Sequence, residues 1–243
     1  MTTAKARQED ERAYVLHTYP FQDTSVVVEA FTRQHGRIGI LAKGARRPKS
    51  PLRAALLAFQ PLSIAWTGRG ELPILVRADW VGRQHVLTGI AMMCGYYLNE
   101  LLLKLVQRDD AHEGLFDAYD EALRGLAGTE TSQAVLRRFE IALLRELGYA
   151  LQLEYEADAD TPIVAERRYA YFSERGPIPA ETAGPGTSAL ELQGQTLLDM
   201  ARGDFTDPRT AAESKVLMRW VIGHHLDQRP LNTRQLLIEL QQL

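Results

Sequence analysis

The first 80 residues contain five short runs that are rich in β-branched and aromatic residues and are separated by turns. The runs span 13–18, 24–31, 37–42, 61–67 and 72–81. Runs of this length and composition favour β-strands, and the glycines and prolines between them indicate turns. Five short strands in so few residues fit a small barrel. We expect an OB-fold, with an SH3-like barrel as the alternative.

After residue 82 the spacing of apolar residues becomes that of helices. We expect helices over 90–106, 115–126, from Thr131 or Ser132 to Gly148, and over 188–202, 210–226 and 233–243. Between them, residues 149–187 contain four prolines and form an irregular segment, with a short hairpin around 168–172. The predicted fold is therefore α+β, with a barrel domain over residues 1–82 and a mostly helical domain over residues 83–243.

Charge is distributed unevenly along the chain. From Ala30 to Gly70 there is no acidic residue, whereas eight lysines and arginines occur there. Residues 1–80 hold 12 Lys or Arg against 7 Asp or Glu, and the remainder holds 16 against 24. A one-signed stretch in an otherwise acidic chain is typical of a polyanion-binding surface, because each neutralised phosphate releases a counterion. The alternative is a solvated loop with several exposed arginines.

Seven cations of this part of the barrel are the candidate phosphate-binding residues. They are Arg37, Lys43, Arg46, Arg47, Lys49, Arg53 and Arg69. Aromatic side chains on a barrel face stack on unpaired bases, and the candidates are Tyr19, Phe21, Phe31 and Trp66. Each of these aromatics is also a candidate core residue. A protein-interaction scaffold whose basic loop binds an acidic partner is the alternative function.

Several other classes of protein are disfavoured by the sequence. Cys94 is the only cysteine, which excludes an internal disulfide and a cysteine-based zinc site within one chain. The first dozen residues are polar, and no apolar run approaches the length of a membrane helix. We expect a cytoplasmic monomer with no metal or cofactor, associated with the nucleoid when it is bound to DNA.

The sequence also lacks a convincing catalytic site. Residues 44–50 echo a phosphate-binding loop, but Lys49 occupies the position of its second glycine. His224 and His225 are adjacent on a predicted helix and point in different directions, so they do not form a metal clamp. The acidic residues of 109–113 and 154–160 fit a polar helix start and a solvated loop. We therefore predict that the protein is not an enzyme.

A second candidate site combines apolar and basic residues of two consecutive predicted helices. Phe116, Tyr119 and Leu123 share one helix face, and Arg137 and Arg138 lie beside an apolar stripe on the next. An apolar pocket rimmed by arginine suits a peptide that ends in an aromatic residue and a free carboxylate. The alternative is a helix–helix core with exposed arginines.

Segments along nearly the whole chain, in order, resemble the DNA repair protein RecO family. They are 14–18 with 23–25, 36–37, 42–46, 59–62, 68–72, 97–102, 115–116, 136–140, 147–149, 229–231 and 233–237. The resemblance implies an N-terminal OB-fold on a helical domain. Many members of the family carry a four-cysteine zinc module after the segment that corresponds to 147–149. Residues 151–172 here contain no cysteine, so the chain resembles a zinc-free variant whose irregular segment is held by packing.

The resemblance also implies a function and partners. It implies a non-enzymatic recombination mediator that binds single- and double-stranded DNA and anneals complementary strands. It further implies work with RecR, and in some lineages RecF, in loading RecA onto DNA coated by single-stranded DNA-binding protein (SSB). Family members of some lineages recognise the acidic, phenylalanine-ending SSB tail. The resemblance thereby makes this tail the expected ligand of the second candidate site.

Overall fold

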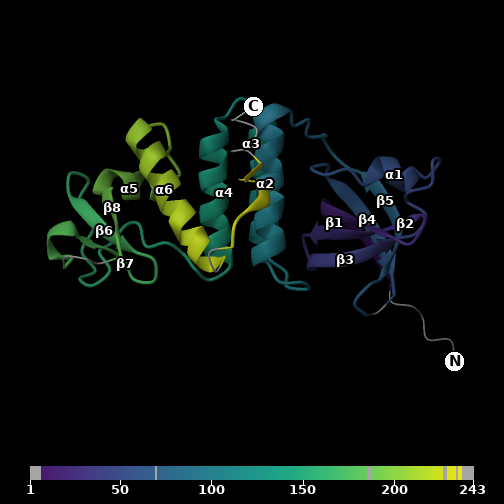
Figure 1. Ribbon diagram of the computed structural model, residues 1–243, viewed down its shortest axis with the longest axis horizontal. Helices are drawn as coiled ribbons and strands as arrows, with labels where there is room; N and C mark the ends of the chain where they lie inside the picture. Colours follow the sequence, from purple (N-terminus) through teal and green to yellow (C-terminus); the bar gives the residue numbers. More distant parts are fainter. Residues whose placement is uncertain (1–6, 69, 185–187, 227–228, 234, 237–243) are drawn as a thin grey trace. The chain divides into compact units, whose positions relative to one another are not determined.

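The computed structural model describes residues 7–68, 70–184, 188–226, 229–233 and 235–236. Two compact units are present (Figure 1). Unit 1 is formed by residues 1–129 together with residues 231–243, and unit 2 by residues 130–230. The last barrel strand ends at Trp80 and the first long helix begins at Gly89. Unit 1 extends beyond this change, because it also contains the first two long helices.

Five strands of unit 1 close into a barrel. They are β1 (Arg7–Phe21), β2 (Ser25–Thr32), β3 (Gly36–Ala42), β4 (Leu62–Thr67) and β5 (Ile74–Trp80). Their order around the barrel is β1-β2-β3-β5-β4, and only β3 and β5 pair in parallel. This five-stranded closed sheet followed by helices confirms the predicted fold class, with an OB-fold at the N-terminus.

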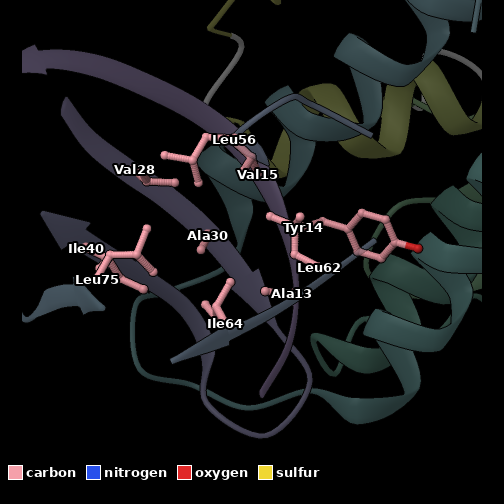
Figure 2. A pocket seen from close by; sticks show the side chains of 10 residues that line it. All are labelled: Ala13, Tyr14, Val15, Val28, Ala30, Ile40, Leu56, Leu62, Ile64 and Leu75. Atoms are coloured by element: carbon pink, nitrogen blue, oxygen red, sulfur yellow. The ribbon is translucent and has the colours of Figure 1, made fainter. Parts of the chain in front are cut away.

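Apolar side chains fill the inside of the barrel (Figure 2). Ten residues line a small hollow there. One of them is Leu56, the residue that follows α1 (Pro51–Ala55). The ring of Tyr14 points away from the hollow, out of the barrel (Figure 2). Alternation of inward and outward side chains along β1 places this ring against the helices of unit 1. The hollow is therefore part of the hydrophobic core, and a binding surface has to lie on the outer face of the barrel or on its loops.

Two long helices of unit 1 pack on the outside of the barrel. They are α2 (Gly89–Leu105) and α3 (Glu113–Ala127). Buried Asn99 links them to β1, because its Nδ2 donates to the Leu16 carbonyl at 2.9 Å and its Oδ1 accepts from the Tyr119 hydroxyl at 2.5 Å. Gly95 lets α2 pack closely here, since a Cβ at this position would lie 2.8 Å from the side chains of Leu87 and Phe59 and would displace them.

The chain returns to unit 1 after residue 230, and α2 holds the returning segment. The buried carboxylate of Glu100 accepts hydrogen bonds from the backbone N–H groups of Asn232 and Thr233 at 2.8 and 2.9 Å. Burial raises the pKa of Glu100, but these bonds and Lys104 outweigh it and hold the pKa below its usual range. Of the helix expected over 233–243, residues 234 and 237–243 lie outside the described part of the chain.

Unit 2 combines helices with a small sheet. Its elements are α4 (Ser132–Glu146), β6 (Arg168–Phe172), β7 (Gly176–Pro179), η1 (Ala180–Thr182), β8 (Leu190–Gln193), α5 (Gly194–Arg202) and α6 (Pro208–His225). The sheet order is β7-β6-β8, so the expected hairpin gains a third strand in place of the first residues of the helix expected over 188–202. Thr131 caps α4 by accepting from the Ala134 amide.

Polar contacts and packing together hold the irregular segment of unit 2. The guanidinium of Arg167 pairs with Glu156 at 3.0 Å and also with Glu181. Glu156 is buried, and the Tyr169 hydroxyl donates to it at 3.3 Å. The expectation of packing alone therefore understates the role of ion pairs in this cysteine-free segment.

Candidate nucleic-acid interface

The connection from β3 to α1 presents cations at one end of the barrel. Ala45 is buried in the barrel core, whereas the flanking residues Lys43, Arg46 and Arg47 are exposed. Gly44 permits the turn, because its φ of +69° is a backbone conformation that side-chain-bearing residues rarely adopt. One small apolar residue thus anchors the loop and leaves its charged neighbours in solvent.

Five exposed cations belong to this connection and to α1, and together we call them the basic segment. They are Lys43, Arg46, Arg47, Lys49 and Arg53. Within the part of the chain that the structure describes, none of the five forms an ion pair with a carboxylate. Their charge is available to an anionic ligand, as a phosphate-binding surface requires.

Two other connections of the barrel lie beside the basic segment. The Arg46 amide donates to the Thr24 carbonyl, in the turn from β1 to β2, at 2.8 Å. At the end of β3, the Leu41 amide donates to the Pro73 carbonyl, in the connection from β4 to β5, at 2.8 Å. In OB-folds the β1–β2 and β4–β5 loops and the face of strands 2 and 3 bind oligonucleotides. The basic segment is therefore located where this architecture binds nucleic acid.

Arg37 does not belong to this surface, which corrects the prediction from sequence. It lies at the other end of β3, and its side chain is only 16% exposed. Its guanidinium donates to Glu29 at 3.0 Å and to the Val106 carbonyl at 3.0 Å. Arg108 also pairs with Glu29. Because Arg37 neutralises a buried carboxylate, it is a structural residue of unit 1.

Arg69, the last of the seven predicted phosphate-binding residues, lies outside the described residues.

Arg33 is a further cation of the acid-free stretch and contacts α3. Its Nε and Nη2 donate to Asp117 at 3.1 and 3.0 Å, and it also pairs with Glu113. The hydrogen bond from Arg33 holds the pKa of Asp117 below its usual range.

The predicted stacking aromatics divide between core and surface. Phe31 and Trp66 are buried, which agrees with their alternative role in the core. Phe21 is half-buried, and Tyr19 is 47% exposed. Sequence reasoning missed Trp80, which is 44% exposed. Its position at the end of a predicted strand was the only sequence signal that Trp80 is exposed, because the barrel no longer covers side chains where a strand ends.

The residues of the predicted peptide pocket fit the alternative core role. Phe116, Tyr119 and Leu123 are at most 1% exposed, and the rings of Tyr14 and Phe31 lie 5.6 Å from the ring of Phe116. Barrel side chains therefore fill the space that a peptide would need in unit 1.

The two arginines of this predicted pocket belong to unit 2 and are both paired there. Arg137 is buried and contacts Glu140 at 2.5 Å, and Arg138 pairs with Glu130. A peptide carboxylate would have to compete with these pairs.

Titratable residues at other positions serve the packing of unit 1. Asp120 accepts a hydrogen bond from the Tyr14 hydroxyl, and His85 Nε2 lies 3.8 Å from its Oδ1. His85 and Tyr14 hold the pKa of Asp120 below its usual range. Burial and the bond to Asp120 raise the pKa of Tyr14.

The residues considered for metal binding are dispersed or paired with each other. Over the described ranges, no group of three or more His, Cys, Asp or Glu side chains is arranged to hold a metal ion. His112 Nε2 lies 3.2 Å from Asp110 Oδ2, and His225 packs on Tyr149. In the same ranges, no helix has both the length and the apolar character needed to cross a bilayer.

Comparisons with known proteins agree with the barrel-plus-helices architecture. Residues 7–83 match the family described as Recombination protein O N terminal, and residues 87–235 match Recombination protein O C terminal. DNA repair protein RecO of Aromatoleum aromaticum is 51% identical over 239 residues, which cover 98% of this chain and 99% of that protein. DNA repair protein RecO of Nitrosospira multiformis is 50% identical over the full length of both chains. The chain belongs to the RecO family of DNA repair proteins.

Proposed function

We propose that this protein is a non-enzymatic recombination mediator that binds DNA through the basic segment and anneals complementary strands. The observation that carries the proposal is a set of five exposed cations at the loop end of an OB-fold barrel, none of which pairs with a carboxylate of the described residues. Membership of a DNA repair family supports DNA as the ligand. In the same proposal, the protein helps to load RecA onto SSB-coated single-stranded DNA.

The mechanism is electrostatic. Each phosphate that a lysine or arginine neutralises releases a condensed counterion, and this release drives binding without base specificity. A strand whose phosphates are partly neutralised repels its complement less strongly. Arg46 and Arg47 are adjacent on an exposed turn, so we expect them to contact consecutive parts of one backbone. The chain binds and brings strands together, and no catalytic group takes part.

The proposed partners extend beyond DNA. From the family resemblance we expect RecR, and in some lineages RecF, to act with this protein on SSB-coated DNA. Recognition of the SSB tail through the five pocket residues has no support in the burial of Phe116, Tyr119 and Leu123. We therefore place the proposed DNA function on the basic segment alone.

Annealing of SSB-coated complementary strands tests the proposal. The variant R46E/R47E reverses two charges of the basic segment and should slow annealing at least tenfold. The matched control is K215E/R219E, which reverses two exposed cations of α6 and changes the net charge equally. The control should anneal within twofold of the wild type. Equal loss in both variants, or loss in neither, would contradict the proposal and favour a scaffold that binds an acidic protein.

A further inference from the structure

Trp80 is a large exposed aromatic side chain at the end of β5. Its residue is 44% exposed, whereas Trp66 on the neighbouring strand is 8% exposed. It pairs in the ladder with Leu62, the first residue of β4, so it stands where the barrel wall ends. Burying an indole is strongly favourable, so an exposed indole next to charged residues indicates a surface that binds a ligand.

One hydrogen bond fixes the orientation of this indole. Trp80 Nε1 donates to the carbonyl of Ala55, the last residue of α1, at 3.0 Å. The single polar atom of the side chain is thereby satisfied within the protein, and the exposed part of the ring is apolar. A ring held in this way loses little conformational freedom when a flat ligand packs on it.

The same bond ties Trp80 to the basic segment. α1 carries Arg53 two residues before Ala55, and Lys49 precedes α1 by two residues. Arg83, three residues after Trp80, is also exposed and forms no ion pair among the described residues. The hydrogen bond from Trp80 to Ala55 thus joins two parts of the chain that carry Lys49, Arg53 and Arg83, three exposed cations that pair with no described carboxylate.

We propose that Trp80 is a stacking platform for an unpaired base of the strand whose phosphates the basic segment holds. Stacking of a base on an aromatic ring strengthens binding and tolerates any base, because every base has a π-face. This inference rests on the proposed DNA function and deepens it. A duplex offers no free base face except at its ends, so Trp80 selects single-stranded over double-stranded DNA.

Affinity measurements on Trp80 variants test this selectivity. At fixed moderate salt, W80A should bind oligo(dT) about tenfold more weakly than the wild type, and duplex binding should change less than twofold. W80F keeps a ring and should retain most of the affinity, whereas W80L keeps apolar bulk and should behave like W80A. L57A removes a neighbouring side chain that is 50% exposed and should leave oligo(dT) binding within twofold of the wild type. Circular dichroism checks that each variant is folded.

Tryptophan fluorescence reports the contact directly. The chain has three tryptophans, so W66F/W220F leaves Trp80 as the only indole. Oligo(dT) should quench its emission in a saturable manner, and W66F/W80F, which retains Trp220, should show no such quenching.

Salt-dependent oligo(dT) binding with no quenching of Trp80 and an unchanged W80A affinity would overturn the stacking proposal alone. Absence of salt-dependent binding in the wild type would instead overturn the proposed function. If W80A and L57A weakened binding of RecR equally and left oligo(dT) binding unchanged, Trp80 would belong to a protein-docking surface.

Discussion

The cations of the acid-free stretch divide into two groups with different surroundings. Lys43, Arg46 and Arg47 are exposed and form no ion pair with any described carboxylate. Arg33 and Arg37, in the same stretch, are held by carboxylates of α3 and β2. The partners of the second group lie outside the stretch. Glu29 precedes it on β2, and Glu113 and Asp117 of α3 lie 80 and 84 residues after Arg33. Charge along the sequence therefore overestimates the charge that the surface offers to DNA.

The physical reason for the division is desolvation. Glu29 is 3% exposed, and a buried carboxylate without a cation is costly. Arg37 and Arg108 supply that cation. If either of them bound a phosphate instead, the buried Glu29 carboxylate would lose part of its neutralisation and the fold would be destabilised. No carboxylate of the described ranges pairs with the basic segment, and its five side chains keep their charge in solvent.

Removal of Arg37 is the change that separates the two groups most strongly. R37A leaves Glu29 with Arg108 alone, and we expect the free energy of unfolding to fall by about 2 kcal/mol. Urea denaturation measures this, with R46A as the matched control, whose unfolding free energy should change by less than about 0.5 kcal/mol. At a temperature where R37A is folded, its affinity for oligo(dT) should stay within twofold of the wild type. A tenfold weaker affinity at unchanged stability would put Arg37 back on the DNA surface.

Low pH should weaken the carboxylate contacts that hold the barrel to α3. Asp120 has a depressed pKa in the folded state, with His85 and Tyr14 as the leading causes. Its stabilising contribution is therefore present above the unfolded pKa of about 3.9 and is lost as the pH falls through the lower folded value. D120N removes this contribution and should cost about 1 kcal/mol at pH 6. The difference in unfolding free energy between wild type and D120N should shrink at pH 3. An equal difference at both pH values would show that Asp120 contributes without its charge.

Much of the fold could be predicted from sequence because its signals are local. The five strands follow from β-branched runs and turns, and Thr131 marks the start of α4. The helix α1 was missed because five residues after a proline-rich loop show no helical periodicity, and Ser50 provides no side-chain cap. The strand β8 was missed because the residues that follow it form a strongly helical pattern.

Prediction of the site was less complete because it depends on contacts distant in sequence. The exposure of the loop cations could be predicted from composition alone, because charged side chains of a loop favour solvent. Whether Arg37 is free depends on Glu29 and Val106, and the burial of Phe116 depends on Tyr14 and Phe31. The role proposed for Trp80 could not be inferred from sequence, because it depends on the hydrogen bond from Trp80 Nε1 to the Ala55 carbonyl of α1.

The salt dependence of single-strand binding tests most directly which cations contact DNA. With roughly five phosphate contacts, log affinity for oligo(dT) should fall with log salt at a slope near −3.5. The account predicts that R46A/R47A reduces the steepness by about 1.4, whereas folded R37A retains the wild-type slope. A wild-type affinity that does not depend on salt, or a slope that R37A lowers as much as R46A/R47A does, would contradict it.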